Sequence, residues 1–437
     1  MKINLITLGC AKNLVDSETL AGMLLKEGLS FTDELENADA IILSTCAFVG
    51  SARKEAYGYI KKITRIKDKN QIFIVAGCLP QLEGDTLLKK YPGIDAIFGP
   101  DGFRGIPRYL KNRKQTGNNK LFRIADKPHL ICSSSDPRII TTGSFAYLKI
   151  ADGCDNRCSY CLIPSIRGKY RERPIEDIVK EAQYISGRGI REIILTAQDT
   201  TLYGMKLYHK QKLDVLLRKL SKIKNIKWIR LLYTHPAHFT DNIINEIKDN
   251  DKVCKYVDIP VQHTHDDILK LMNRPPAASI FSAIEKLRKN IDDIALRTTV
   301  MTGFPGEEEK HFKKMLGDIK EIGFDWLGCF VYQKEKGTPA YTLKNQVALK
   351  IKKERYDKIM LAQQRIVKKK NAARVGNIYD VIPDSIYSGH AEFQSPEDDG
   401  RIYFLNPKLI KSIEPVKVKI ELVNDVYDLE GEIIKKY

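Results

Sequence analysis

The sequence predicts an α/β protein in three parts: an N-terminal domain with a parallel sheet, a central open barrel of six β/α units, and a small all-β domain. Three observations support this prediction. Apolar runs alternate with helical segments through the first 100 residues, the alternation resumes on a larger scale from Ser144, and short strands separated by turns follow Arg374. A chain of 437 residues exceeds the usual size of one hydrophobic core, so two or three domains are expected.

Three apolar runs in the N-terminal part each end in a cysteine: Cys10, Cys46 and Cys78. In a parallel sheet with right-handed crossovers all strands point the same way, so these thiols should emerge together at the carboxyl edge, where α/β folds bind ligands. One such cysteine is most simply a core residue. Three at equivalent positions instead indicate an iron–sulfur cluster with three protein ligands, whose remaining iron is free to bind something else.

Residues 101–142 are rich in Gly, Pro, Asn, Lys and Ser, which predicts a linker. The expected domains are therefore residues 1–130, 140–370 and 374–437. Cys132 lies inside this linker without a partner at a useful spacing, and it is interpreted as a non-ligand.

Six strand-like runs predict the central sheet. Helical stretches lie between them, such as residues 307–323, whose apolar side chains recur at intervals of three and four. Fewer than eight β/α units would leave a barrel open, and its site should lie at the carboxyl edge of the strands. The six runs are 144–150, 191–196, 227–233, 255–261, 294–301 and 325–332.

A compact cysteine motif follows the first of these strands. Cys154, Cys158 and Cys161 are separated by three and two residues, a spacing that lets three thiolates converge on one loop. Iron–sulfur clusters usually take four thiolates, and a fourth cysteine close behind Cys161 is missing, so one iron would lack a protein ligand. A structural zinc site is the alternative, although zinc prefers four ligands in paired short spacings.

Other candidates lie at the predicted strand ends. Residues 196–201, which include Gln198, follow the second strand, and Gly303 begins a Gly-Phe-Pro-Gly-Glu turn after the fifth. Histidines near strands three and four could ligate a metal, but hydrogen-bonded structural roles are favoured; they are His235, His263 and His265. Cys254 and Cys329 lie in or beside apolar runs and are interpreted as core thiols.

Composition limits the setting in which the protein works. Nine cysteines without a secretory segment favour a reducing, cytoplasmic location, where thiols serve as ligands or core residues rather than disulfides. No segment reads as a membrane span. The formal net charge of +17 suggests an anionic partner such as RNA, but the charge is unevenly distributed.

The C-terminal part departs from this basic character. Residues 345–373 predict a long amphipathic helix whose charges form a solvated face. Residues 374–437 carry 8 basic and 12 acidic side chains. A domain that grips a phosphate backbone should be basic, so this domain is expected to meet a cationic protein. The turn with Glu397, Asp398 and Asp399 is the expected contact.

Taken together, these motifs resemble the methylthiotransferases, which join a three-cysteine N-terminal domain to a radical S-adenosylmethionine (SAM) partial TIM barrel and a C-terminal TRAM domain. The resemblance covers essentially the whole chain. Four stretches are similar to the RimO branch, which modifies an aspartate of protein S-twelve of the small ribosomal subunit. Two positions depart from that branch: Ala11 replaces a common proline, and residues 392–394 have longer side chains than usual. The similar stretches are residues 8–18, 198–204, 395–400 and 427–432.

The resemblance implies replacement of a C–H bond at the β-carbon of that aspartate by a methylthio group. It implies two 4Fe-4S clusters and SAM as cofactors. A cluster on Cys154, Cys158 and Cys161 would generate a radical from SAM, and a cluster on Cys10, Cys46 and Cys78 would hold the sulfur. Tyr160 is expected to pack beside the SAM adenine. The other expected SAM contacts are Gln198, Arg297 and Gly303.

The implied partners are protein S-twelve as substrate and an electron donor such as a flavodoxin or ferredoxin. One alternative is a methylthiotransferase that modifies an adenosine of tRNA; the basic body of the chain favours it, and the acidic C-terminal region does not. A second alternative, from another class, is a non-catalytic RNA-binding protein with a structural metal.

Overall fold

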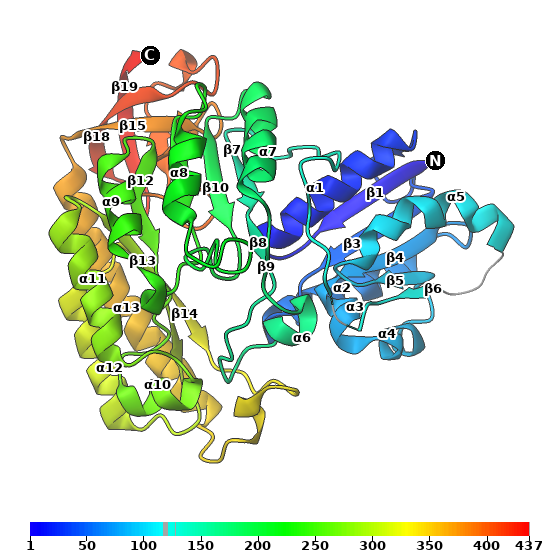
Figure 1. The fold of residues 1–437 in the computed structure, drawn as a ribbon, viewed down its shortest axis with the longest axis horizontal. Coiled ribbons are helices and arrows are strands. Elements are labelled where there is room, and N and C mark those ends of the chain that lie inside the picture. The colour runs from blue at the N-terminus through cyan, green and yellow to red at the C-terminus, as the bar shows by residue number, and fades with distance from the viewer. Residues whose placement is uncertain (117–120, 127, 437) are drawn as a thin grey trace. The chain divides into compact units, whose positions relative to one another are not determined.

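The computed structural model describes residues 1–116, 121–126 and 128–436. The chain divides into two compact units, each with its own parallel sheet (Figure 1). The first unit comprises Met1–Thr141 with two later segments, Ala151–Arg157 and Cys161–Ile178. The second unit contains Thr142–Ile150, Cys158–Tyr160 and Val179–Tyr437.

The sheet of the first unit has six parallel strands in the order β2-β1-β3-β4-β5-β6. The residues of β3 and β4 are buried throughout, as expected for central strands covered on both faces. This confirms the predicted parallel-sheet N-terminal fold. The strands are β1 (Lys2–Thr7), β2 (Ser30–Phe31), β3 (Ala40–Thr45), β4 (Ile72–Gly77), β5 (Ala96–Phe98) and β6 (Leu121–Arg123).

The helices of this unit are amphipathic segments that cover the sheet. Ala56, Ile60 and Ile63 of α2 recur at helical spacing and enter one core with strand residues such as Phe73 and Val75. The helices are α1 (Ala11–Lys26), α2 (Gly50–Ile66), α3 (Cys78–Glu83), α4 (Asp85–Lys90), α5 (Ile106–Thr116) and α6 (Ile163–Arg167), with a 3-10 turn η1 (Gly102–Gly105). A hairpin of β8 (Ala151–Asp152) and β9 (Arg171–Glu172) belongs to the same unit.

The predicted linker is wrong over its first half. Its described residues include η1 (Gly102–Gly105), α5 (Ile106–Thr116) and the edge strand β6 (Leu121–Arg123), which continue the first unit and its sheet. The polar composition of this stretch concealed three apolar side chains at helical spacing. Phe103, Ile106 and Leu110 are all buried, and burying them favours a helix on the sheet over an extended linker.

The second unit contains the predicted open sheet. Its six strands are all parallel and follow the chain in the order β7-β10-β11-β12-β13-β14. Helices α8 (Leu213–Ser221), α9 (Asp241–Asp249) and α13 (Leu349–Arg374) pack against these strands, while α11 (Ala277–Asn290) packs against α9 and α12 (Glu309–Ile322) against α13 (Figure 1). The open barrel of six β/α units is thereby confirmed. The strands are β7 (Phe145–Lys149), β10 (Glu192–Thr196), β11 (Trp228–Leu231), β12 (Val253–Asp258), β13 (Ala295–Thr302) and β14 (Trp326–Val331).

The long predicted helix is α13 (Leu349–Arg374), but its charges do not all form a solvated face. Lys352 and Arg355 are buried, and Arg355 bonds to Glu307 with Nη1 2.7 Å from Oε1. The remaining helices are α7 (Ile175–Gly187), α8 (Leu213–Ser221), α9 (Asp241–Asp249), α10 (Asp266–Met272), α11 (Ala277–Asn290) and α12 (Glu309–Ile322). The remaining 3-10 turns are η2 (Pro236–His238), η3 (Pro339–Thr342) and η4 (Pro407–Leu409).

The C-terminal residues form a closed five-stranded barrel in the order β15-β16-β17-β19-β18. Closure pairs every strand on both sides and leaves no open edge. This confirms the small all-β barrel expected after residue 374. The strands are β15 (Ile378–Pro383), β16 (Ser388–Ala391), β17 (Ile402–Phe404), β18 (Val416–Val423) and β19 (Leu429–Lys436).

Residues 384–399 of this small barrel bond to all six strands of the second sheet, near the ends where those strands begin. The strand residues that make these contacts all lie at or near the start of their strands. They are Ser144, just before β7, the first residue of β10 and of β14, and the third residue of β11, β12 and β13. The small barrel therefore covers the amino edge of the sheet, opposite the carboxyl edge from which the Cys154 loop leaves. The paired groups are Ser144 with Asp384, Glu192 with His390, Arg230 and Lys255 with Glu392, Arg297 with Asp399, and Trp326 with the Phe393 carbonyl.

This arrangement corrects the interpretation of the acidic turn. The Asp399 side chain is 1% exposed; its Oδ2 accepts a hydrogen bond from the Tyr256 hydroxyl at 2.7 Å, and its Oδ1 lies 3.4 Å from Arg297 Nε. Glu397 accepts a hydrogen bond from Tyr147 at 3.0 Å. Asp399 is therefore enclosed and not available to a cationic partner, whereas Glu397 and Asp398 remain exposed.

A buried charged network lies at the same junction. Arg230 Nε donates to Glu192 Oε1 at 2.6 Å, and His390 Nε2 lies 2.6 Å from the other oxygen of Glu192. His390 Nδ1 is 2.9 Å from Asp384. Burial acts to lower the pKa of His390, but Glu192 and Asp384 outweigh it and raise the pKa to about 9. This network joins β10 and β11 to β16.

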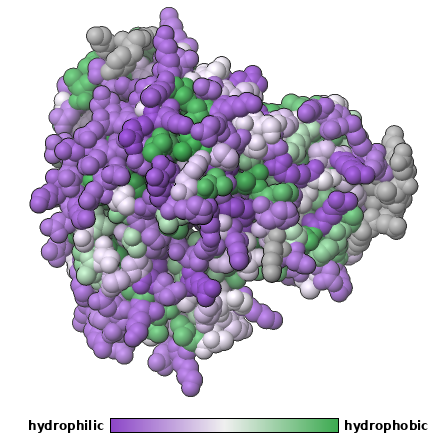
Figure 2. Space-filling view, viewed as in Figure 1, coloured by the Kyte–Doolittle hydropathy of each residue, from purple (hydrophilic) through white to green (hydrophobic). Residues whose placement is uncertain are grey.

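None of the described helices is long and apolar enough to cross a membrane. Figure 2 shows hydrophilic residues over most of the visible face, with apolar residues in small separate groups. Such scattered apolar side chains are ordinary for a protein surface.

The raised pKa of His390 predicts a pH-dependent stability. The folded chain keeps this proton up to a pH near 9, whereas the unfolded chain releases it near 6.5. The contribution is therefore fully present below pH 6.5 and lost as the pH rises through 9. We expect the free energy of unfolding of the second unit to fall by on the order of 3 kcal/mol across this range. His390→Gln should remove this fall, measured by calorimetry at several pH values. His209→Gln, at an exposed histidine, should retain it.

The buried position of Asp399 predicts a second effect. Burial raises the pKa of Asp399 to about 7, so this carboxyl group is ionised above that pH. There, Asp399→Asn should lower the free energy of unfolding by about 3 kcal/mol, because Arg297 loses a buried anionic partner. Asp398→Asn is the matched control, since this neighbouring carboxylate also faces Arg297 but is 39% exposed. Its loss should cost less than about 1 kcal/mol. Equal unfolding temperatures for the two variants would contradict an internal role for Asp399.

Candidate functional site

Cys10, Cys46 and Cys78 follow three adjacent strands of the first unit. Thr7 of β1 pairs with Ser44 of β3, and Thr45 of β3 pairs with Gly77 of β4, so the three strands end at the same edge. Cys10 and Cys78 each stand at the start of a helix, α1 and α3. The structure thus places the predicted residues in one row at the carboxyl edge of the sheet.

Two glycines allow this close arrangement. A Cβ at Gly9 would lie 2.4 Å from Cys46 Cβ and 3.3 Å from its Sγ, so a side chain there would displace Cys46. A Cβ at Gly77 would lie 2.6 Å from the Thr45 carbonyl oxygen. Both residues have positive φ angles, +101° and +94°, which side chains other than glycine rarely adopt. The backbone before Cys10 and Cys78 is therefore specialised for close packing.

The three thiols differ in their electrostatic surroundings. Burial raises the pKa of Cys78 to about 12, and burial together with the nearby Cys10 raises the pKa of Cys46. Burial also acts to raise the pKa of Cys10, but the charges of Lys12 and Arg167 and the backbone N–H groups that begin α1 outweigh it, so this pKa is lowered. Such enclosed thiols suit a bound cluster, which takes them as thiolates.

The second cysteine set lies on the loop after β7 and β8, and all three thiols are half-buried and free of disulfides. In the first unit, Cys154 N donates to the Gly168 carbonyl at 3.1 Å, and Cys161 Sγ accepts from Ile163 N at 3.4 Å. In the second unit, Ser159, next to Cys158, donates from its backbone to Met272 at 2.9 Å and from its hydroxyl to Leu271 at 2.7 Å. Hydrogen bonds thus fix this loop while its thiols stay partly exposed. This arrangement suits an iron–sulfur cluster in which one iron has no protein ligand and is accessible to another molecule.

Tyr160 packs against the turn that begins at Gly303. Its ring lies edge-on to Phe304 with centroids 6.5 Å apart, in an apolar group with Met272 and Tyr332. The turn is held by Glu307, whose Oε1 accepts from Gly303 N at 3.0 Å. Arg355 and Lys352 of α13 buttress it: Arg355 bonds to Glu307, and a Cβ at Gly303 would meet the Lys352 stem at 2.2 Å. Two of the predicted SAM contacts, Tyr160 and Gly303, therefore lie in or directly beside one apolar cluster.

Gln198 and Arg297 occupy different positions. Gln198 follows β10 at the carboxyl edge and is half-buried. Arg297 is the third residue of β13, and its guanidinium lies 3.3 Å from Asp258, 3.6 Å from Asp398 and 3.4 Å from Asp399. Burial acts to lower the pKa of Arg297, and these carboxylates outweigh it and raise the pKa. This guanidinium is paired within the protein.

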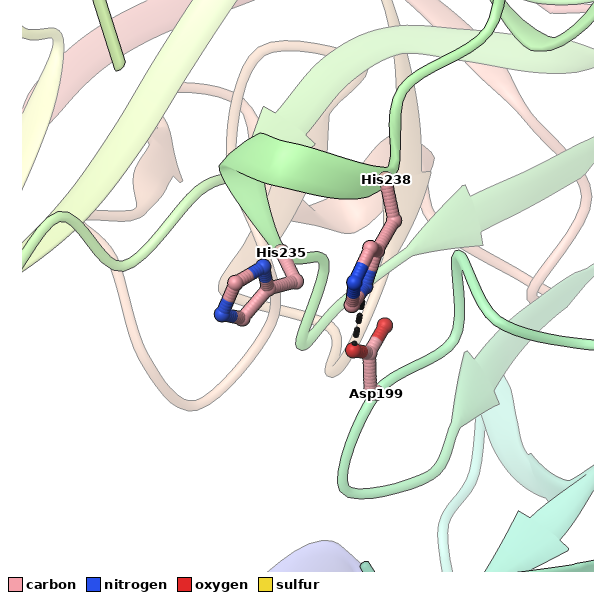
Figure 3. A group of neighbouring side chains, drawn as sticks. All are labelled: Asp199, His235 and His238. Atoms are coloured by element: carbon pink, nitrogen blue, oxygen red, sulfur yellow. Dashed lines mark hydrogen bonds and ion pairs between the residues drawn. The ribbon is translucent and has the colours of Figure 1, made fainter. Parts of the chain in front are cut away.

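Asp199, His235 and His238 meet at the carboxyl edge of the second sheet (Figure 3). His238 Nδ1 lies 2.8 Å from Asp199 Oδ2, while Oδ1 accepts from the Thr201 hydroxyl at 2.6 Å. The two histidine rings stack with centroids 4.5 Å apart. Burial, followed by the charge of Arg274, lowers the pKa of His235 to about 3, so this imidazole is neutral.

The three predicted histidines make hydrogen bonds of the structural kind, while His235 and His265 also belong to groups whose possible ligand atoms lie within 4.8 Å of one another. Each of the three histidines uses Nδ1 to accept a backbone N–H two residues ahead: His235 from Ala237, His263 from His265, and His265 from Asp267. Cys254 is buried in β12 as expected, and Cys329 of β14 is half-buried. Cys132 is buried, and its Sγ lies 3.5 Å from Asp16 Oδ1.

Two residues, one at each candidate site, were not anticipated from the sequence. His238 completes the pair with Asp199, and its signal was a second histidine three positions after His235. Arg167 lies beside the first cysteine set, as its effect on the pKa of Cys10 shows. Its signal was the basic run of residues 167–173, directly after the second cysteine motif.

Comparison with known proteins agrees with this geometry. Residues 148–319 match the model of the radical SAM superfamily, and residues 2–99 match the model described as uncharacterized protein family UPF0004. The structure of the radical SAM methyltransferase TsrM from Kitasatospora setae aligns with a TM-score of 0.58 at 13% identity, covering 78% of this chain and 76% of that one. This likeness shows a shared fold.

Relatives along the full chain are closer. The ribosomal protein uS12 methylthiotransferase RimO of Acetivibrio thermocellus is 42% identical, covering 100% of this chain and 99% of the relative. The protein of the same name from Carboxydothermus hydrogenoformans is 43% identical, covering 99% of this chain and 100% of the relative. This chain belongs to the RimO family of radical SAM methylthiotransferases.

Proposed function

We propose that this protein adds a methylthio group to the β-carbon of an aspartate in ribosomal protein uS12. The observation that carries the proposal is the match to uS12 methylthiotransferases along the whole length of a chain that carries two sets of three free cysteines. As a radical SAM enzyme it uses SAM and an iron–sulfur cluster. The matching relatives carry the uS12 name, which gives this substrate more support than a tRNA adenosine.

The two thiol sites have different proposed roles. Cys154, Cys158 and Cys161 would hold the cluster of the radical SAM domain, and Cys10, Cys46 and Cys78 would hold a second 4Fe-4S cluster. When bound, these groups and SAM supply a radical able to break an unactivated C–H bond and a place to hold sulfur. The chain contributes three thiols to each site, so neither set fills a four-ligand cluster by itself.

The residues around the cysteine loop would bind and orient SAM. Tyr160 and the Gly303 turn lie on one apolar wall suited to an adenine ring, and Gln198 follows β10 at the same edge. For Arg297 we propose an indirect role. It holds Asp258, whose Oδ2 accepts from Tyr233 N at 2.9 Å and so orders the segment after β11.

The substrate and the electron source are the proposed partners. Protein uS12 would be the substrate, and a flavodoxin or ferredoxin would be the electron donor. Since Asp399 is enclosed, the exposed Glu397 and Asp398 are the carboxylates of this turn that remain available to a basic substrate.

The substrate proposal is tested with purified components. The reconstituted enzyme is incubated anaerobically with SAM, a sulfide source, a chemical reductant and either uS12 or total tRNA. We expect mass spectrometry to find one methylthio group in place of one hydrogen on an aspartate of uS12, and no modified adenosine in the tRNA. Modification of the tRNA without modification of uS12 would show that the alternative substrate is correct.

The division of roles predicts distinct behaviour for two triple variants. With Cys10, Cys46 and Cys78 changed to Ala, the protein should keep about half of its iron and still cleave SAM, but transfer no methylthio group. With Cys154, Cys158 and Cys161 changed to Ala, it should also keep about half of its iron but not cleave SAM. Iron analysis and chromatography of 5′-deoxyadenosine measure these outcomes. Full product from the first variant would refute a role for Cys10, Cys46 and Cys78 in sulfur transfer.

A further inference from the structure

Arg167 is a buried cation beside the N-terminal cysteine set. It ends α6, and its side chain is 3% exposed. Ile166 and Leu162 of the same segment pack in one core with Cys78, and α6 contacts α3, the helix that Cys78 begins. A segment that follows the second cysteine motif therefore supplies a charged side chain to the site formed by the first.

The two ends of this guanidinium differ. Nη1 is paired twice: with Asp16 of α1 at 2.6 Å and with Asp152 of β8 at 3.2 Å. Nη2 is fully enclosed and makes no hydrogen bond with any residue that the structure describes. A buried donor without an acceptor is unfavourable, so such a group usually indicates a ligand or another role. The two carboxylates hold the guanidinium in place and leave this donor free.

The guanidinium lies beside the thiol site. Its helix α6 contacts α3, the helix that Cys78 begins, and its charge acts to lower the pKa of Cys78, Cys10 and Cys46. Lys12 is the other cation that acts on Cys10. A fixed guanidinium with a free N–H is suited to an anion, because charge-assisted hydrogen bonds are stronger than neutral ones.

We propose that Arg167 is a positioning residue that donates a hydrogen bond from Nη2 to a small anionic sulfur ligand, hydrosulfide or methanethiolate, bound at the Cys10, Cys46 and Cys78 site. The proposal rests on the proposed function, which assigns the sulfur to this site. Arginine suits the role better than lysine, because its planar group can bind two carboxylates on one side and present a further donor on the other.

Arg138 provides a matched control. It is also a buried arginine paired with α1: its Nη2 and Nε lie 2.6 Å and 2.9 Å from Glu18 Oε2. Glu18, the carboxylate that Arg138 binds, lies two helical turns beyond Cys10 on α1. Arg138→Lys therefore weakens a comparable buried ion pair without removing a donor from the site.

The test uses the full-length chain with Cys154, Cys158 and Cys161 changed to Ala, so that the electron paramagnetic resonance signal comes from the N-terminal cluster alone. Sodium methanethiolate is titrated into the reduced protein, and the spectral change gives an apparent Kd. The parent and Arg138→Lys should bind equally. Arg167→Lys should bind about 10-fold and Arg167→Met about 100-fold more weakly, with unchanged iron content, because a charge-assisted hydrogen bond is lost.

Equal binding by the parent and Arg167→Met would overturn the proposal. So would failure of both Arg167 variants to assemble the cluster, because the role of the guanidinium would then be structural. If only the Arg167→Met variant fails to assemble the cluster, the apparent Kd of Arg167→Lys for methanethiolate tests the proposal: a Kd equal to that of the parent would overturn it. Absence of iron from Cys10, Cys46 and Cys78 in the parent would instead contradict the proposed function itself, so the two failures are distinguishable.

Discussion

Parallel strand pairing is the constraint on which both thiol sites depend. Since every strand in each sheet runs the same way, residues that follow the strands collect at one edge without any need for sequence proximity. Cys10, Cys46 and Cys78 come from segments more than thirty residues apart, yet they follow adjacent strands with matched registers. In the second sheet the same rule brings the cysteine loop, Gln198, the Asp199–His238 pair and the Gly303 turn to one edge.

The opposite edge of the second sheet is used for stability. The C-terminal barrel bonds there to all six strands through a network that buries Arg230, Glu192 and His390. Buried charges are expensive unless each one is paired, and here each group has a partner. A network of this kind also constrains geometry, because a shifted strand would leave one charge unpaired. The chemistry and the support of the sheet thus lie at separate ends of the strands.

Charge counts therefore have limited value for finding interaction surfaces in this protein. Asp399 of the acidic turn and Lys352 and Arg355 of α13 belong to segments that look like solvent-exposed charge in the sequence, yet all three are enclosed. Each is bound to a residue far away along the chain: Asp399 to Tyr256, Lys352 to Tyr332 and Arg355 to Glu307. The acidic character of residues 374–437 reflects in part these internal pairs.

The sequence by itself determined the alternation of strands and helices, the parallel sheets, the closed β domain and the alignment of six cysteines with strand ends. These features depend on local periodicity and on direction rules that hold for any parallel sheet. Only the tertiary structure decided which charges are internal, that β6 (Leu121–Arg123) completes the first sheet, and that Arg167 accompanies the first cysteine set. The reason is physical: a charge is stabilised in a protein interior by a partner, and these partners lie far away along the chain, 151 residues between Arg167 and Asp16 and 198 between His390 and Glu192.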